Sequence, residues 1–211
     1  MVTRLRTVVY FRAMKSVAET SVVHVGCTNP RRNLPAAVAL GRRENNFVAA
    51  FGETYVREAM GRHRAARRSH AAGRELNVAG FGIADFVWVA WQNAPRSQEG
   101  RGLGLRVRPR RVTVLAFEMK LKDWRRALAQ AVRYRYFADA VFVVLPPPAA
   151  ACARKSLVTF RDMRVGLWSF DKQTERIHKM FTPRRSRPLS PAARQKAIAI
   201  LSHKLKIPPV S

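Results

Sequence analysis

The chain has 211 residues, of which 47% are hydrophobic, so we expect one core of ordinary size with extensions rather than two domains. Its 40 Lys and Arg against 13 Asp and Glu give a formal net charge of +27, which makes nucleic acid the first partner to consider, although an Arg-rich proteome with a solvated basic surface is the plainer explanation. Two isolated cysteines exclude a disulfide framework, and the lack of a secretory leader or of an apolar run near the roughly 18 residues of a membrane span predicts an intracellular protein, cytoplasmic or nucleoid-associated, with no membrane partner.

The first part of the chain predicts an arm and a helix. Residues 1–40 are weakly patterned, and we expect a loosely ordered basic arm there. Between residues 42 and 60, apolar side chains recur at every fourth position, which predicts a helix with one buried stripe. They are Phe47, Phe51, Tyr55 and Ala59. A basic connector, residues 61–73, follows and contains Arg64, Arg67 and Arg68.

Residues 75–91 predict either a strand pair or one long strand kinked near Gly80 and Gly82. Asp85 lies in the most apolar part of this segment. Aspartate is depleted in strands, and a buried aspartate is usually paired or functional. A second basic connector, residues 92–111, contributes Arg106, Arg108, Arg110 and Arg111.

Residues 112–146 predict a βαβ unit: a buried strand, a helix that Asp123 opens, and a second buried strand at 140–145. Side chains alternate along a strand, so Glu118 and Lys120 share one face of the first strand. Burying two charges side by side costs several kcal/mol unless they are paired, hydrogen-bonded or bound to a metal. The βαβ unit is therefore the first place to look for a site.

The boundaries of the two strand segments predict how they pair. If Trp91 and Val112 are opposed in an antiparallel pair, opposed residue numbers sum to 203, and Asp85 faces Glu118. Two carboxylates opposite one another in a sheet repel each other. A divalent cation between them would turn the repulsion into attraction.

The remainder of the chain is less informative. Residues 149–160 are ambiguous, and residues 164–170 predict a short strand. Residues 182–187 form a basic loop with Arg184 and Arg185, and Ser190-Pro191 predicts the start of a last helix that ends near residue 205. We therefore divide the chain into the arm (1–40), an α/β domain (41–181), and a basic loop with a C-terminal helix (182–211).

The spacing of Asp85, Glu118, Met119 and Lys120 matches Asp…Glu-x-Lys, with the two acids on adjacent strands. This resembles the PD-(D/E)xK superfamily of restriction-endonuclease-like nucleases over about a third of the chain. The following helix carries Gln130 and Tyr134, a Gln-x-x-x-Tyr spacing similar to that of the RecB-type and lambda-exonuclease-type branch. One departure is Ala84, where the family commonly has proline before the aspartate.

The resemblance implies a restriction-endonuclease-like α/β core, in which a mixed sheet with an antiparallel strand pair and a βαβ crossover is flanked by helices. It implies a nuclease that hydrolyses phosphodiester bonds, of DNA in preference to RNA, with Mg2+ or Mn2+ held by Asp85, Glu118 and the carbonyl group of Met119. Lys120 would orient or help deprotonate the attacking water, or stabilise the developing negative charge. Supporting roles fall to Gln130 and Tyr134, and to a helix-borne acid that we assign to Glu44, with Glu53 and Glu58 as alternatives. The basic residues of the two connectors and of the 182–187 loop would bind the nucleic acid, and a homodimer is left open.

Plainer explanations stay open at the level of sequence. Asp85 and Glu118 can form a structural ion pair with Lys120, and Gln130 with Tyr134 can be a helix surface pair. The alternative function is a non-catalytic nucleic-acid-binding protein on the same fold. A third is a basic structural protein of a nucleoprotein assembly, which the apolar βαβ core disfavours.

Overall fold

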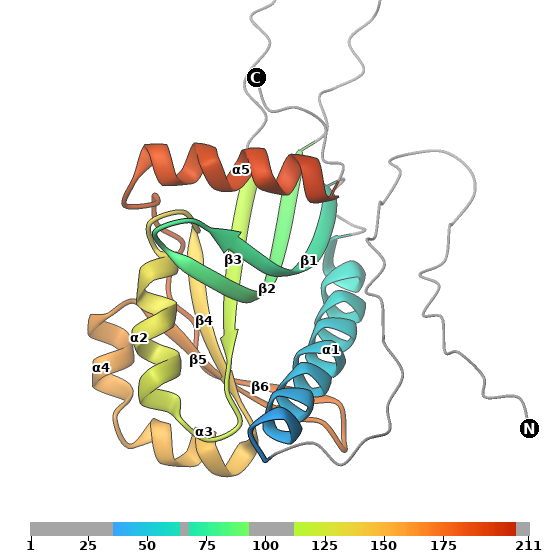
Figure 1. The fold of residues 1–211 in the computed structure, drawn as a ribbon, viewed down its shortest axis with the longest axis vertical. Coiled ribbons are helices and arrows are strands. Elements are labelled where there is room, and N and C mark those ends of the chain that lie inside the picture. Colours follow the sequence, from blue (N-terminus) through green and yellow to red (C-terminus); the bar gives the residue numbers. More distant parts are fainter. Residues whose placement is uncertain (1–35, 64–67, 93–111, 206–211) are drawn as a thin grey trace, which may run out of the picture.

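The computed structural model describes residues 36–63, 68–92 and 112–205, which form an α/β fold with a six-stranded mixed sheet (Figure 1). In chain order the elements are α1 (Ala36–His63), β1 (Arg68–Val78), β2 (Gly82–Gln92), β3 (Val112–Met119), α2 (Trp124–Tyr134), β4 (Ala140–Leu145), α3 (Pro147–Arg154), α4 (Leu157–Asp162), β5 (Val165–Asp171), β6 (Arg176–Phe181) and α5 (Pro191–Leu205). Among the described helices, none is long and apolar enough to cross a membrane.

The strands lie in the sheet in sequence order, β1-β2-β3-β4-β5-β6. Strands β1, β2 and β3 are antiparallel neighbours, β3, β4 and β5 are parallel, and β6 returns antiparallel to β5. The βαβ unit β3-α2-β4 is therefore confirmed, and the segment before it is a strand pair with a turn rather than one kinked strand. Helix α2 begins as predicted, because a carboxylate oxygen of Asp123 accepts a hydrogen bond from the backbone N–H of Arg126 at 3.0 Å.

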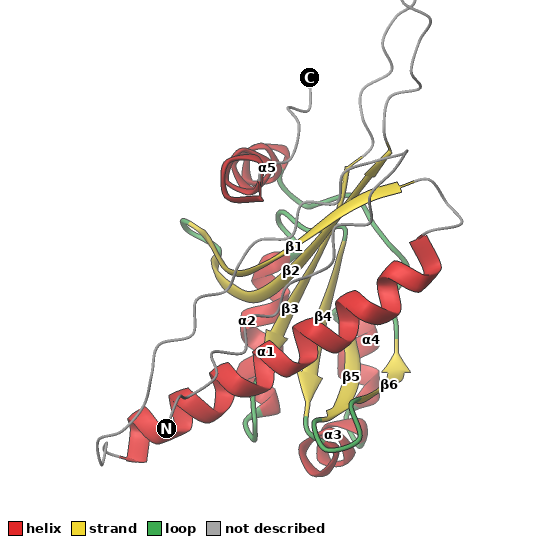
Figure 2. Cartoon of the chain, turned by 90° about the vertical axis from the view of Figure 1, so that its right-hand side faces the viewer, coloured by secondary structure: helices red, strands yellow, loops and turns green. Residues whose placement is uncertain are grey.

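One face of the sheet packs against α1 through a cluster of aromatic side chains. The predicted stripe Phe47, Phe51, Tyr55 and Ala59 is buried, and the ring centroids of Phe51 and Phe117 are 5.4 Å apart. A fully buried aromatic or branched side chain contributes about 1.5–3 kcal/mol, so this stripe fixes α1 across the sheet. Figure 2 shows α1 crossing the sheet on the side opposite to α2 and α4.

The other face is covered by α2, α3, α4 and α5, whose buried residues join a second core cluster. Helix α5, which the sequence places in a separate C-terminal segment, buries Ala193, Ala197, Leu201 and Leu205 in this cluster, one at every fourth position. Its Arg194 donates to the carbonyl oxygens of Phe137 and Val112, both at 2.8 Å, and pairs with Asp139 at 2.7 Å.

Several local predictions differ from the structure. Helix α1 begins at Ala36, inside the predicted arm, and the rest of the arm lies outside the described residues. The connector 61–73 contains the end of α1 and the first half of β1, because the strand pair needs a partner for the whole of β2. The ambiguous segment forms α3 and α4, and β6 was not predicted, because its residues are mostly exposed and carry little apolar alternation.

Candidate functional site

The predicted pairing of β2 with β3 is confirmed. Trp91 pairs with Val112 and Phe86 with Phe117, so opposed residue numbers sum to 203. The pairing stops at Phe86, and at the next position an oxygen of the Asp85 side chain accepts a hydrogen bond from the backbone N–H of Met119 at 2.7 Å. The side chain of Asp85 therefore satisfies a backbone donor of β3 where the regular pairing with β2 ends.

Strand β1 is irregular at the same level. Arg74 pairs with Phe86 and Leu76 pairs with Ala84, but Glu75 between them has φ +53°, a left-handed conformation. Such a conformation costs a residue with a side chain about 1–3 kcal/mol, and it persists only where the surroundings hold it. Here Lys204 of α5 donates to the carbonyl oxygen of Glu75 at 3.3 Å. The pairing of β2 is thus disturbed on both sides at Asp85.

Glu118 is buried at the end of β3, with 1% of its surface exposed. Its Oε2 accepts a hydrogen bond from the hydroxyl of Tyr134 at 2.6 Å, and its Oε1 lies 3.3 Å from Nζ of Lys120. Burial, and then the charge of Asp85, raise the pKa of Glu118 from its ordinary 4.5 to about 7, against the opposing effects of Tyr134 and Lys120. Burial also raises the pKa of Asp85.

The hydroxyl of Tyr134 has two acceptors but one proton. It contacts Oε2 of Glu118 and also the carbonyl oxygen of Ile83 on β2. A phenol has a single proton to donate, so the Glu118 carboxylate and the Ile83 carbonyl oxygen compete for the Tyr134 hydroxyl. Because the pKa of Glu118 is raised to about 7, the charge of this carboxyl group changes with pH near neutrality.

Lys120 connects the sheet to α1. Its Nζ lies 3.3 Å from Glu118 and 3.7 Å from Oε2 of Glu44. Burial lowers the pKa of Lys120, but Glu118, Asp85 and Glu44 raise it by more, so its pKa lies above the ordinary value. At neutral pH Lys120 is therefore an ammonium ion, which can hold an anion or orient a water but cannot accept a proton.

The structure brings Glu44, among the three candidate acids of α1, to the site. Glu53 and Glu58 follow it by nine and fourteen residues, or about 13 and 21 Å along a helix. Glu53 is exposed, and neither reaches the Lys120 ammonium from that distance. Phe47 and Phe51 fix this assignment, because the buried stripe sets both the rotation of α1 and its position along the sheet.

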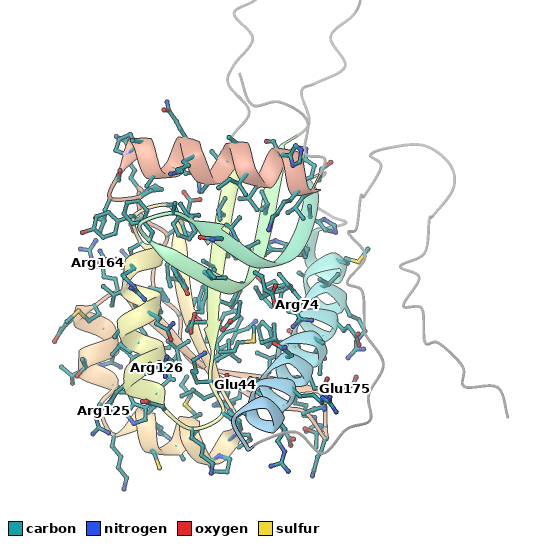
Figure 3. The ribbon with its side chains drawn as sticks, viewed as in Figure 1. Glu44, Arg74, Arg125, Arg126, Arg164 and Glu175 are labelled. Carbon is teal, nitrogen blue, oxygen red and sulfur yellow. The ribbon has the colours of Figure 1, made fainter. Side chains whose placement is uncertain are left out.

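Arg74 is a site residue that sequence reasoning missed. It lies on β1 beside Asp85 and donates to the carbonyl oxygen of Asn45 at 3.2 Å. Its positive charge opposes the rise that burial causes in the pKa of Asp85. Figure 3 shows Arg74 and Glu44 between α1 and the sheet. The position of Arg74 follows from its pairing with Phe86. The sequence did not predict that β1 is long enough for this pairing. Three carboxylates, of Asp85, Glu118 and Glu44, thus lie near two cations.

The two predicted helix residues differ in their environment. Tyr134 is fully buried and reaches Glu118, whereas Gln130, one turn earlier on the same face, has a buried Oε1 with no hydrogen-bond partner among the described residues. An unpaired buried carbonyl costs about 1–3 kcal/mol, so Gln130 lacks a partner that a ligand or water would supply.

The donor set fits a hard divalent cation. Within the described ranges, no group of three or more His, Cys, Asp or Glu side chains is arranged to hold a metal ion. Magnesium takes one or two carboxylates and keeps several waters, which matches Asp85 and Glu118. The pKa values of both acids are raised, chiefly because burial penalises their charged forms.

Only some of the predicted nucleic-acid-binding residues lie in the part of the chain that the structure describes. Arg184 and Arg185 are exposed between β6 and α5. The side chain of Arg68 at the start of β1 is not described, and Arg64, Arg67, Arg106, Arg108, Arg110 and Arg111 lie outside the described residues. Further basic side chains lie on α2 and beside α4, including Arg125, Arg126 and Arg164 (Figure 3). His70 of β1 is buried and stacks on Trp88, with ring centroids 4.6 Å apart.

No family model and no curated protein matches the chain. Among solved structures, it is similar to the SPO1766 protein of unknown function from Silicibacter pomeroyi, with 16% sequence identity and a TM-score of 0.40. That match covers 68% of this chain and 75% of the other.

Proposed function

We propose that the chain is a metal-dependent nuclease with a restriction-endonuclease-like core, which hydrolyses phosphodiester bonds, of DNA in preference to RNA, at Asp85, Glu118 and Lys120. The observation that carries the proposal is the arrangement of these three side chains where β2 separates from β3. The formal charge of +27 supports a polyanionic substrate.

Each residue has a chemical role in this proposal. Asp85 and Glu118, with the carbonyl group of Met119, would hold Mg2+ or Mn2+, which supplies Lewis-acid polarisation of the phosphate. Lys120 holds a phosphate oxygen or the attacking water and stabilises negative charge, because its raised pKa keeps it protonated. The oxygen of the attacking water bonds to phosphorus and releases a proton to solvent, the bond to the leaving sugar oxygen breaks, and that oxygen takes up a proton from solvent, so no proton is gained or lost overall.

The surroundings of these residues support the roles. Tyr134 orients Glu118, and Glu44 with Glu118 holds the Lys120 ammonium from two sides. Arg74 adds a second cation beside Asp85. A site that only stabilised the fold would not need three carboxylates around one lysine, since like charges in a sheet are destabilising.

The alternative is a non-catalytic nucleic-acid-binding protein. The ion pair of Glu118 with Lys120, 3.3 Å apart, favours it, because that pair can be purely structural. The two functions differ in what metal does: the nuclease turns over with Mg2+, and the binding protein does not.

The test is cleavage of labelled DNA and RNA with Mg2+, with Mn2+ and in chelator. We expect cleavage with metal, and its loss by at least about 100-fold in Asp85→Ala, Glu118→Gln and Lys120→Ala, with binding measured in chelator nearly unchanged. Lys122→Ala, which removes an exposed lysine two residues away, is the matched control and should cleave like the wild type. Metal-independent cleavage, or near wild-type cleavage by Glu118→Gln, would contradict the assignment.

A further inference from the structure

A surface hollow of about 360 Å3 adjoins the proposed site. Its lining residues come from the first half of α1, the start of α3, the end of β5 and the β5–β6 turn, elements that Figure 1 shows at the lower end of the fold, and from the segment after β3. Arg43 and Asn46 line it on either side of Glu44, and Leu121 lines it directly after Lys120. Ligands of α/β sheets bind outside the carboxyl ends of parallel strands, which is where β3, β4 and β5 end here.

The inner wall of the hollow is apolar. It is formed by Phe47, Leu121, Pro146, Pro147 and Phe170. Phe47 and Phe170 also contact each other, with ring centroids 5.4 Å apart, so this part of the wall is held by the aromatic core. Phe47 and Phe170 are buried behind the wall, so its accessible apolar surface comes from Leu121, Pro146 and Pro147, on which the face of a planar base can pack.

The rim is polar and carries cations. Arg43 and Lys172 are exposed on opposite elements, α1 and the β5–β6 turn, and Asn46 and Gln173 add two amides. The carboxylate of Asp171 is engaged within the turn, where it accepts hydrogen bonds from Gln173 N and Thr174 Oγ1, both at 2.9 Å. Helix α3 offers few backbone donors here, because Pro147 and Pro148 have no N–H. The attraction for a phosphate therefore comes from the two side-chain cations.

We propose that this hollow holds one unpaired nucleotide of the substrate strand, next to the phosphate that lies at Lys120. The inference rests on the proposed function for the phosphate and extends it to the kind of substrate. A volume near the lower end of the ~300–1,000 Å3 range of small-molecule pockets suits one nucleotide and not a base pair. The base packs on the apolar wall, Asn46 and Gln173 reach its polar edge, and Arg43 and Lys172 hold the flanking phosphate. The chain would then favour strands with an unpaired nucleotide beside the site.

The test is binding of two labelled duplexes of the same sequence, one blunt and one with a short single-stranded overhang, to the full chain in chelator. We expect the wild type to bind the overhang duplex more tightly. Leu121→Trp, which fills the hollow, and Arg43→Ala/Lys172→Ala, which removes the two rim cations, should each weaken overhang binding about tenfold, or about 1.4 kcal/mol. Blunt-duplex binding should change less than the overhang binding in both variants.

Matched controls separate the hollow from general charge and bulk. Arg161→Ala/Lys196→Ala removes the same charge from α4 and α5, and Leu189→Trp adds the same ring at an exposed leucine; both should leave the ratio of the two affinities unchanged. If Leu121→Trp does not fold, the double alanine variant, which changes two exposed residues, still gives the answer.

Equal weakening of both duplexes by the hollow variants, or a wild type without preference, would overturn the inference. Because affinity is measured without metal, the result is independent of cleavage. A wild type that never cleaves but shows a preference that the hollow variants lose would overturn the nuclease and keep the nucleotide site. A wild type that cleaves but shows no such preference would keep the nuclease and overturn the nucleotide site.

Discussion

The hydroxyl group of Tyr134 lies 2.6 Å from Oε2 of Glu118 and also contacts the carbonyl oxygen of Ile83, so a single phenol on α2 joins the beginning of β2 to the end of β3. Regular pairing between these two strands ends at Phe86 and Phe117. Tyr134 therefore bridges the strands where their backbones no longer do, and it holds the carboxylate that the proposed site needs.

Replacement of this phenol should affect both stability and metal binding. In Tyr134→Phe the Ile83 carbonyl and Glu118 lose a buried partner, so we expect the free energy of unfolding in chelator to fall by about 1–3 kcal/mol. Loss of a group that orients a metal ligand should weaken Mg2+ affinity by about 10–100-fold. Denaturant melts and Mg2+ titrations of cleavage measure the two effects. Tyr136→Phe, at a partly exposed tyrosine of the same region, is the control, and equal effects in both variants would contradict the role of Tyr134.

The raised pKa of Glu118 predicts a pH dependence of stability. Between its ordinary value of 4.5 and its folded value of about 7, the folded chain binds a proton that the unfolded chain has released. The free energy of unfolding therefore falls as the pH rises through this window, by an amount on the order of a few kcal/mol, and stays low above it. Thermal melts of the metal-free protein from pH 4.5 to 8 should show this loss, and Mg2+ should restore stability at the upper end.

Glu118→Gln separates this effect from other titrations. The variant cannot ionise at this position, so its stability should change less between pH 4.5 and 8 and should exceed that of the wild type at pH 8 in chelator. Wild type and variant should differ little at pH 4.5, where Glu118 is largely protonated in the folded protein. A variant clearly less stable than the wild type at pH 8 would mean that the ion pair with Lys120 outweighs burial and the repulsion from Asp85.

Arg194 should hold α5 onto the sheet. Its guanidinium pairs with Asp139 at 2.7 Å and donates to two backbone carbonyl oxygens, of Phe137 and Val112. Arg194→Ala leaves these groups unpaired in a partly buried place, so we expect about 2–4 kcal/mol of destabilisation in denaturant melts. Lys196→Ala, two residues away on the exposed side of α5, should change stability by less than about 0.5 kcal/mol. Similar losses in both variants would show that the network contributes little.

The exposed Arg184 and Arg185 should contribute to the salt dependence of nucleic-acid binding. Each phosphate that a cation neutralises adds about −0.9 to the slope of log K against log salt on duplex DNA. Arg184→Ala/Arg185→Ala should therefore flatten the slope by up to about 1.8 and weaken two unrelated duplexes equally, because phosphate contacts carry no sequence information. Arg57→Ala is the control, since its guanidinium is paired with Glu175 at 2.7 Å. An unchanged slope would place the 182–187 loop away from the nucleic acid.

Local patterns were sufficient for a large part of the fold. The helical spacing from Phe47 to Ala59, the Asp123 cap of α2 and the apolar runs of β3 and β4 are short-range signals, and each element is present. The register of β2 on β3 was predictable for the same reason, because side-chain alternation and one pair of strand ends fix the register of an antiparallel pair, although the pairing stops at Phe86, one residue before Asp85. These features depend on residues close in sequence or on strands whose ends the sequence marks.

The remaining features were decided by packing between distant segments. Glu44 was indistinguishable from its neighbours on α1 until the stripe of Phe47 and Phe51 set the position of that helix on the sheet. The contact of Tyr134 with Ile83, the position of Arg74 beside Asp85, and the hollow between α1 and the β5–β6 turn likewise join residues far apart in the chain. No periodicity encodes such contacts, because they depend on the summed burial of whole elements and not on the residues that meet.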